Sequence, residues 1–175
     1  MELFYHGTDI DSAKEICSNK KPDVRKGSRY TDFGQGFYIT DNRESAEKWA
    51  FRKASLRNKK PALITITFDV EAAEPYIERF SDDLRWGRFI INNRNGLAYI
   101  KEIRFQENNL DARYPITFGR IADIEIRNVA KELSEKKEML SSLDKILNPA
   151  YPIQYAFHTD EATKFIKKMS YQSLV

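Results

Sequence analysis

Residues 31–40, TDFGQGFYIT, are the stretch from which the fold and function of this chain are best inferred. Gly34 and Gly36 precede a short apolar segment, FYI, which is typical of a strand. Glycine adopts backbone angles closed to other residues and lets another molecule approach the main chain, so the pair suits a sharp entry into a strand beside a ligand. Strand alternation turns Tyr38 to the face opposite its two neighbours. An ordinary β-turn before a half-buried strand also explains the decapeptide, so its meaning depends on other stretches.

Length and composition favour one globular domain. The chain has 175 residues, of which 41% are hydrophobic and 31% charged, so we expect residues 1–175 to form a single domain with a core of its own. The one cysteine, Cys17, excludes an internal disulfide. No apolar run approaches the roughly 18 residues of a membrane span, and the N-terminus lacks the pattern of a secretion signal. We therefore expect no membrane partner and a cytoplasmic location.

Periodicity predicts alternating helices and strands, and hence an α+β fold. The clearest signal is the alternation of apolar residues over 62–70, which is typical of a strand with one buried face. The segment 97–113 is ambiguous between strand and turn. Other strands are expected at 3–5, 37–39, 116–118, 121–126 and 153–157. Helices are expected at 12–19, at 42–56 with Asp41 as cap, from Ser81 or Asp82 to 92–96, at 129–147, and from Thr159 or Asp160 to about Met169.

Several common chemistries are excluded by residue counts and spacing. With two histidines and one cysteine, no segment resembles a zinc site, and we expect no metal. No phosphate-binding GxxxxGK[ST] loop is present, GQGF lacks the third glycine of a dinucleotide fingerprint, and no GxSxG elbow occurs. Cys17 lies on an apolar helix face, which makes it a poor nucleophile.

Three expected strands carry unusual polar residues at their ends: His6 in YHGT, Tyr38 in GQGFYIT and Gln154 in IQYAFHT. This ordered set resembles the His-Tyr-Glu/Gln branch of the ADP-ribosyltransferase superfamily, which includes diphtheria toxin, the poly(ADP-ribose) polymerases and the RNA 2'-phosphotransferases. It is also similar to a group of small bacterial proteins of uncharacterised function with an IAD motif, here residues 121–123. The likeness extends over 5–159. It implies an ADP-ribosyltransferase-like split β-sandwich with peripheral helices.

The resemblance implies NAD as substrate and gives roles to the first two motifs. Tyr38 matches the family's first ring that stacks on nicotinamide, a contact of about 1 kcal/mol beyond burial. His6 matches the histidine that hydrogen-bonds the adenosine ribose, and Gly7 the glycine that offers its backbone to the nicotinamide amide. Thr8 and Gly36 belong to the same two motifs, and the resemblance implies that they also bind NAD.

Four further residues are weaker candidates for NAD binding. Trp49 falls where the polymerases carry their second stacking ring, and core packing explains it equally well. Ser45 is one residue out of register with the family's amide-binding serine. Arg94 could pair with the pyrophosphate through two hydrogen bonds, or cap its own helix end. Asp123 belongs to the IAD motif, although Ile124 replaces the second acid that often follows it.

Gln154 matches the family's Glu/Gln position. Cleavage of the bond from ribose to nicotinamide develops positive charge on the sugar, while nicotinamide leaves as a neutral molecule that needs no proton. A group that holds the ribose 2'-hydroxyl assists this step, but only a carboxylate also stabilises the charge. The glutamine therefore argues against chain elongation, and it allows either transfer of single ADP-ribose units or binding alone.

We therefore expect a mono-ADP-ribosyltransferase that passes ADP-ribose from NAD to a protein or nucleic-acid acceptor, with His6, Tyr38 and Gln154 as catalytic residues. Bacterial toxins and defence effectors work in this way, and an antitoxin is then a further partner. Two alternatives stay open. One is a catalytically silent module that binds NAD or ADP-ribose, and the other is a 2'-phosphotransferase-like enzyme acting on RNA, suggested by the basic segment 43–60.

Overall fold

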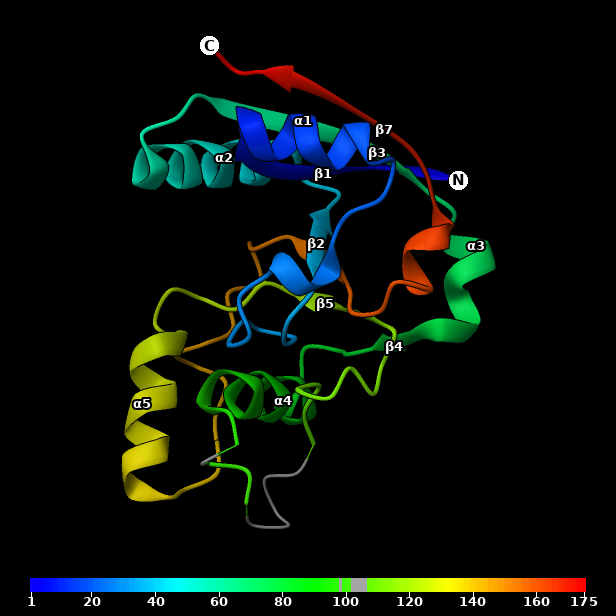
Figure 1. The fold of residues 1–175 in the computed structure, drawn as a ribbon. Helices are drawn as coiled ribbons and strands as arrows, with labels where there is room; N and C mark the ends of the chain where they lie inside the picture. The colour runs from blue at the N-terminus through cyan, green and yellow to red at the C-terminus, as the bar shows by residue number, and fades with distance from the viewer. Residues whose placement is uncertain (98, 102–106) are drawn as a thin grey trace.

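The computed structural model describes residues 1–97, 99–101 and 107–175. These residues form a mixed α+β fold around a seven-stranded sheet with the order β4-β5-β6-β2-β1-β3-β7 (Figure 1). The expected α+β class is confirmed. The strands are β1 (Glu2–Asp9), β2 (Phe37–Thr40), β3 (Pro61–Phe68), β4 (Ile77–Arg79), β5 (Ile116–Arg120), β6 (Ile153–Phe157) and β7 (Ile166–Ser173).

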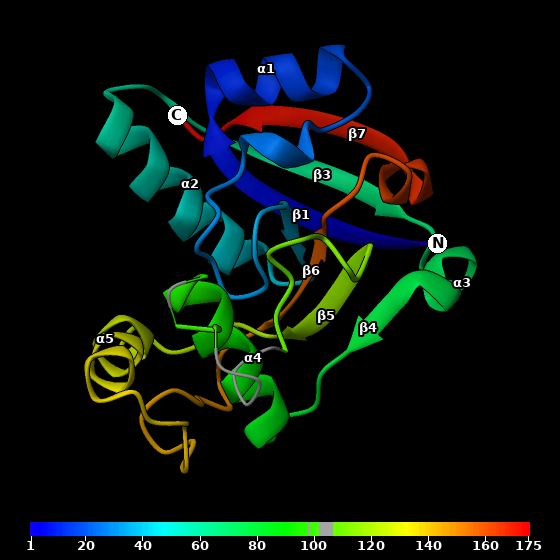
Figure 2. The same cartoon turned by 60° about the horizontal axis from the view of Figure 1, so that its bottom comes forward.

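The helices are distributed between the two ends of the sheet. Helices α1 and α2 lie beside β1, β3 and β7, whereas α4 and α5 lie at the other end of the molecule (Figures 1 and 2). None of the helices in the described part of the chain is long and apolar enough to cross a membrane. Their bounds are α1 (Ile10–Ser18), α2 (Arg43–Arg57), α3 (Val70–Ala73), α4 (Leu84–Asn95) and α5 (Ile126–Lys136).

The sheet is nearly divided between β1 and β2. Strand β1 pairs with β3 along its full length, from Glu2↔Phe68 to Asp9↔Pro61. Strand β2 pairs with β6 over all four of its residues. In contrast, β1 and β2 share a single register pair, Tyr5↔Thr40. We call this point the β1–β2 junction, because the three-stranded and four-stranded parts of the sheet meet there.

Two hydrophobic clusters fill the two sides of the sheet. The first contains Phe33, Trp86 and Phe89 and is covered by α4 and α5. The second contains Phe4, Phe68 and Phe157, with partly buried residues of α1 packed against it. The predicted alternation in β2 is confirmed, because Phe37 and Ile39 belong to the second cluster whereas Tyr38 packs against the first.

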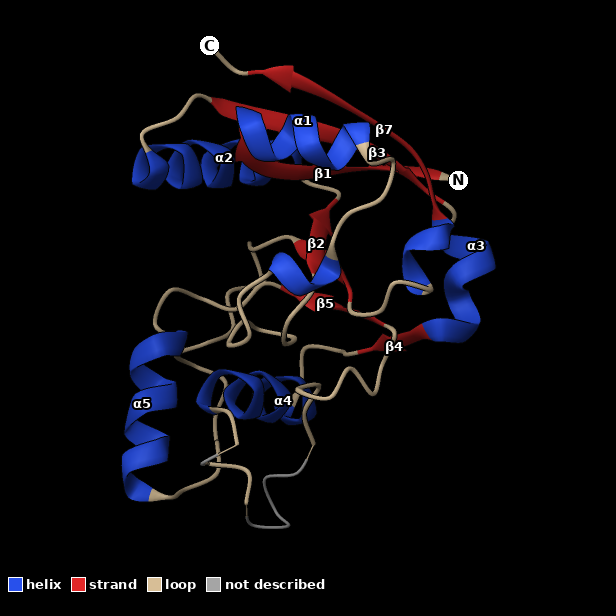
Figure 3. Cartoon of the chain, in the orientation of Figure 1, coloured by secondary structure: helices blue, strands red, loops and turns tan. Residues whose placement is uncertain are grey.

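The predicted long helix over 129–147 is wrong. Helix α5 ends at Lys136, and Lys137 adopts a left-handed conformation with φ 55°. The amide of Glu138 then bonds to the Leu133 carbonyl at 3.0 Å, which closes the helix end. The apolar residues beyond it still reach the core, but from loop and turn structure (Figure 3). The segment 121–126 is not a strand either, since Ile126 begins α5.

The predicted last helix is also wrong. Residues Ala162–Phe165 form a single 3-10 turn, and the chain continues as β7 along the free edge of β3 (Figure 3). Pairs such as Ile66↔Met169 show that backbone pairing with β3 decides the conformation there. Over so short a segment, helical and strand patterns of apolar residues are hard to distinguish.

Smaller differences concern helix starts and the ends of expected elements. Asn42, not Asp41, caps α2 by accepting from the amide of Ser45 at 2.8 Å. Asp83, one or two residues later than expected, caps α4. Asp69 caps α3, so the strand expected to reach residue 70 stops at Phe68. Of the ambiguous segment 97–113, residues 98 and 102–106 lie outside the described residues.

Candidate functional site

Gly7 is the first glycine of the candidate site, and it is required because α2 lies very close to β1. A Cβ atom on Gly7 would lie 1.8 Å from the Ala46 carbonyl oxygen and 2.7 Å from the Ala50 nitrogen. Real side chains do not tolerate such distances, so only glycine lets the helix backbone lie against the strand here. Buried alanines at 46, 50 and 54 provide the matching flat face of α2. This packing brings α2 next to the strand that carries His6.

His6 joins β1 to β2 just beyond the β1–β2 junction. Its Nδ1 lies 2.6 Å from the backbone oxygen of Tyr38. A carbonyl oxygen only accepts, so Nδ1 carries the hydrogen and Nε2 is left as an acceptor. Burial, reinforced by the nearby positive charge of Lys53, lowers the pKa of His6 to about 3. The imidazole is therefore neutral at physiological pH.

Tyr38 is held by the loop that precedes its own strand. Its hydroxyl donates to the Gly34 carbonyl oxygen at 2.6 Å and accepts from the Phe33 amide at 3.1 Å, with Thr31 Oγ1 at 2.8 Å. Burial raises the pKa of this hydroxyl well above its usual value. The tyrosine is therefore held in one position with its hydroxyl protonated.

The same loop carries Asp32, a buried acid that is not among the residues predicted from the motifs. Its Oδ1 receives two hydrogen bonds from the Arg94 guanidinium, at 3.0 Å from Nε and 2.5 Å from a terminal nitrogen. Its Oδ2 accepts from Gln154 Nε2 at 3.3 Å and from the Ala122 amide at 3.2 Å. Asp32 thus joins the loop to α4, to β6 and to the IAD segment.

These contacts fix the amide of Gln154, which is 7% exposed. Because its nitrogen donates to a carboxylate, its Oε1 remains as the acceptor. Gln154 stands opposite Thr40 in the sheet, on the face that also carries Tyr38. His6 thus bonds to the backbone of Tyr38, whereas the side chains of Tyr38 and Gln154 are both held by the loop 31–34, Gln154 through Asp32.

Trp49 lies on the surface of α2 and is 47% exposed, so its interpretation as a core residue is wrong. The Arg52 guanidinium lies 5.2 Å from its ring centroid. One turn further along α2, Lys53 is close enough to His6 to affect its pKa, and burial lowers the pKa of Lys53 itself. An exposed indole and a partly buried ammonium group therefore flank the strand end that carries His6.

The remaining candidates have structural partners. Ser45 lies in the first turn of α2, where Asn42 binds its amide. The Asp123 carboxylate accepts hydrogen bonds from Asn148 Nδ2 at 3.3 Å and from the Glu125 amide at 3.4 Å. It therefore stabilises the turn before α5 and does not contact Gln154. Thr8 is buried at 3% exposure and pairs with Ala62 of β3.

Gly36 and His158 meet at the end of β6. A Cβ atom on Gly36 would lie 2.6 Å from the Phe157 oxygen and 2.9 Å from His158 Nδ1. The expectation that this glycine clears space for a ligand is therefore wrong, since protein atoms occupy that space. His158 donates from Nδ1 to the Gln35 oxygen at 2.7 Å and accepts at Nε2 from Thr117 Oγ1 at 2.9 Å. Both of its nitrogens are used within the fold.

The sequence does contain one signal for Asp32. It is the only acidic residue between Asp23 and Asp41, in a stretch that also holds Arg25, Lys26 and Arg29. A lone carboxylate that begins an aromatic and glycine-rich turn suits a buried ion pair, but the partner, Arg94, is 62 residues away. Spacing alone does not identify such a pair.

A family model described as "Protein of unknown function (DUF3990)" matches residues 1–168. The chain belongs to this family. The match includes all the residues of the site, from His6 to Gln154. No curated protein and no solved structure gives a match.

Proposed function

We propose that this member of the family is a mono-ADP-ribosyltransferase that uses NAD, built on an ADP-ribosyltransferase-like split β-sandwich. The observation that carries the proposal is the arrangement around the β1–β2 junction, where His6 bonds to the backbone of Tyr38 and where the loop 31–34 holds the side chains of both Tyr38 and Gln154. The near division of the sheet at this point is compatible with a split sandwich.

The residues around His6 suit a dinucleotide. Nε2 of the neutral imidazole is an acceptor for a ribose hydroxyl. Trp49 offers an exposed indole on which a planar ring can stack. Lys53 supplies a positive charge beside His6 for a diphosphate. A ring acceptor, an aromatic face and a cation are thus available within one strand end and one helix.

The reaction breaks the bond between ribose C1' and the nicotinamide nitrogen, and the electron pair leaves with nicotinamide. A hydroxyl, amine or similar group of the acceptor then forms a bond to C1' and loses its proton. In this chain, Gln154 Oε1 would accept from the ribose 2'-hydroxyl, because its amide nitrogen is held by Asp32. The neighbouring Asp32 carboxylate would partly replace the charge that glutamate supplies elsewhere, although Arg94 balances it.

The acceptor is a protein or a nucleic acid in this proposal, and a toxin or defence role in the cytoplasm with an antitoxin partner goes with it. One alternative is a module that binds NAD without turnover, favoured by the neutral and largely buried side chain of Gln154. The RNA-directed alternative has less support. In the basic segment 43–60, Arg43, Lys48, Arg57 and Lys59 each pair with a carboxylate of this chain, which lowers the charge left for phosphates.

Release of nicotinamide from NAD and transfer of labelled ADP-ribose in a lysate test the proposal. We expect activity in the wild type and little in Gln154→Ala. Trp49→Ala should weaken NAD binding, whereas Phe51→Ala is the matched control because Phe51 is an equally exposed aromatic on the same helix, at 49%. Binding of NAD without release would favour the silent module. Equal activity of wild type and Gln154→Ala would refute the catalytic role.

A further inference from the structure

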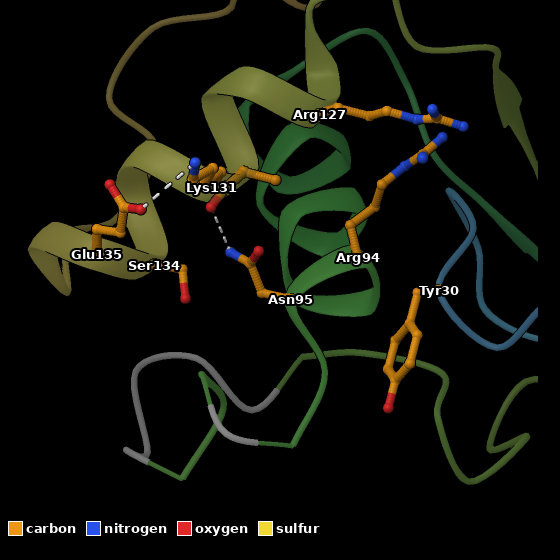
Figure 4. Close-up of a pocket in the computed structure, with 8 residues that line it drawn as sticks. Tyr30, Arg94, Asn95, Arg127, Lys131, Ser134 and Glu135 are labelled. Atoms are coloured by element: carbon orange, nitrogen blue, oxygen red, sulfur yellow. Dashed lines mark hydrogen bonds and ion pairs between the residues drawn. The ribbon is translucent and has the colours of Figure 1, made fainter.

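A cavity of about 540 Å³ lies between α4 and α5 and is lined by neither α2 nor β1. This volume lies in the range of small-molecule sites. One wall is the last turn of α4, with Arg94 and Asn95, and the other is the exposed face of α5 (Figure 4). The amide of Asn95 donates to the Ala130 oxygen at 2.9 Å, so the spacing of the two helices is fixed.

Three cationic side chains line this cavity: Arg94, Arg127 and Lys131. The one carboxylate among the lining residues, Glu135, lies 3.9 Å from Lys131. The Asp32 carboxylate accepts hydrogen bonds from Nε and from one terminal nitrogen of Arg94. Arg127 forms no ion pair or hydrogen bond within residues 1–97, 99–101 and 107–175. The lining therefore has an excess of positive charge.

The two guanidinium groups are directed toward the same region of space. In Figure 4, Arg127 extends from the first turn of α5 and Arg94 from the last turns of α4, and both side chains run toward the same side of the view. Like charges that approach each other are unfavourable unless an anion lies between or beside them. Asp32 already pairs with Arg94, whereas the exposed Arg127 has no carboxylate partner among the described residues, so its guanidinium is available to an anion. Planar guanidinium groups bind phosphate oxygens in pairs.

An aromatic ring completes the cavity. Tyr30 is 56% exposed, and a Cβ atom on Gly96 would lie 2.6 Å from Cε1 of its ring. Gly96 has φ +70°, which disfavours a side chain there in any case. The ring therefore lies against the turn that ends α4 and lines the same cavity as the three cations.

We propose that the α4–α5 cavity binds a phosphorylated nucleotide, with its phosphates on Arg94, Arg127 and Lys131 and its base on Tyr30. The bound group is either a free nucleotide or the 5'-phosphorylated end of an oligonucleotide, which share this chemistry. Binding in the α4–α5 cavity does not require NAD cleavage, so this proposal can be tested independently of the proposed transferase activity.

Calorimetric titration tests the proposal with ADP, pyrophosphate, adenosine and a 5'-phosphorylated trinucleotide as probes. We expect binding of ADP or of the trinucleotide, and the tighter of the two identifies the source of the ligand. Pyrophosphate should bind more weakly and adenosine not measurably. Arg127→Gln and Lys131→Gln should each weaken binding about tenfold, as expected for loss of a charge-assisted contact. Tyr30→Ala should weaken ADP binding but not pyrophosphate binding.

Lys136→Gln is the matched control, because Lys136 lies on the same helix and forms the same type of ion pair, with Glu132, but does not line the cavity. It should change the affinity less than twofold. An equal loss in Lys131→Gln and Lys136→Gln would show binding to general positive charge and overturn the proposal. So would the absence of binding by all probes, or a loss of ADP binding in Trp49→Ala, which would place the ligand beside α2.

Discussion

Gln154 Nε2 lies 3.3 Å from Asp32 Oδ2, so a residue at the start of β6 is oriented by a carboxylate 122 residues earlier in the chain. The same carboxylate holds Arg94 of α4 and the amide of Ala122. A neutral amide is the group that suits this position, because it donates to the acid without adding charge. The glutamine is therefore explained by its neighbour, whatever reaction the site performs.

Gln154→Glu should be destabilising above neutral pH. The new carboxylate would face Asp32, and repulsion raises its pKa in the folded state above that in the unfolded state. A raised pKa makes the folded state more stable at low pH, and this contribution is lost as pH rises through the folded value. We expect a loss of about 1–3 kcal/mol at pH 8 and less at pH 5.5 by urea denaturation. Gln172→Glu, on the exposed edge strand, should show no such difference.

Asp32→Asn should leave Arg94 without its ion-pair partner in a site where the arginine side chain is only 21% exposed. Loss of one member of a largely buried pair costs about 2–4 kcal/mol, whereas removal of both costs less. The double variant Asp32→Asn with Arg94→Met should therefore recover part of the lost stability. Asp41→Asn at an exposed position is the control. A double variant less stable than Asp32→Asn would contradict the pairing.

Gly7→Ala should prevent normal packing of α2, because the added methyl would meet the Ala46 backbone oxygen at 1.8 Å. Gly87→Ala is the matched comparison, since its methyl would meet the side-chain ends of Leu140 and Leu143 at 2.5 and 2.7 Å. The leucine side chains near Gly87 can move to relieve the contact, whereas the helix backbone beside Gly7 cannot. We expect a loss of more than about 3 kcal/mol for Gly7→Ala and about 1 kcal/mol for Gly87→Ala. Equal melting temperatures of the two variants would contradict this.

Stability should fall as the pH is lowered below about 6.5. Burial lowers the pKa of His158 to about 4 and that of His6 to about 3, so between these values and 6.5 the unfolded chain binds more protons than the folded one. The expected slope is at most about 1.4 kcal/mol per pH unit for each histidine. Denaturation curves from pH 7.5 to 4.5 measure it. In His158→Gln the slope should be smaller, and an unchanged slope would show that His158 does not contribute.

Local pattern was sufficient for most of the sheet that carries the site. Strong alternation placed β3, and the register of Phe37 and Tyr38 was predicted correctly because strand period is a property of adjacent residues. The last strand was not predicted, because Ile166–Ser173 is a strand only by pairing with β3, a contact between distant segments. The end of α5 depends on a left-handed lysine, a conformation that sequence seldom reveals.

In the candidate site, too, local motifs were predictable whereas contacts between distant segments were not. The motifs select His6, Tyr38 and Gln154, and in the structure His6 bonds to the Tyr38 backbone while the loop 31–34 holds the side chains of Tyr38 and Gln154. Asp32 was missed, since its importance comes from partners on β6, α4 and the IAD segment that are distant in sequence. The glycine pattern indicates a ligand beside Gly36, whereas the end of β6 occupies that space. What sequence could not supply was the identity of the atoms filling the space beside each residue.

The β1–β2 junction is held more by side chains than by backbone pairing. Within the described residues, the Tyr5↔Thr40 pair and the bond from His6 to the Tyr38 oxygen join the two parts of the sheet along this line. The second hydrophobic cluster spans the junction, because Phe4 of β1 and Phe68 of β3 pack against Tyr155 of β6, with ring centroids 5.3 and 5.2 Å apart. Since His6 contributes one of the few hydrogen bonds there, a ligand that engages its imidazole would act where the sheet has the fewest bonds of its own.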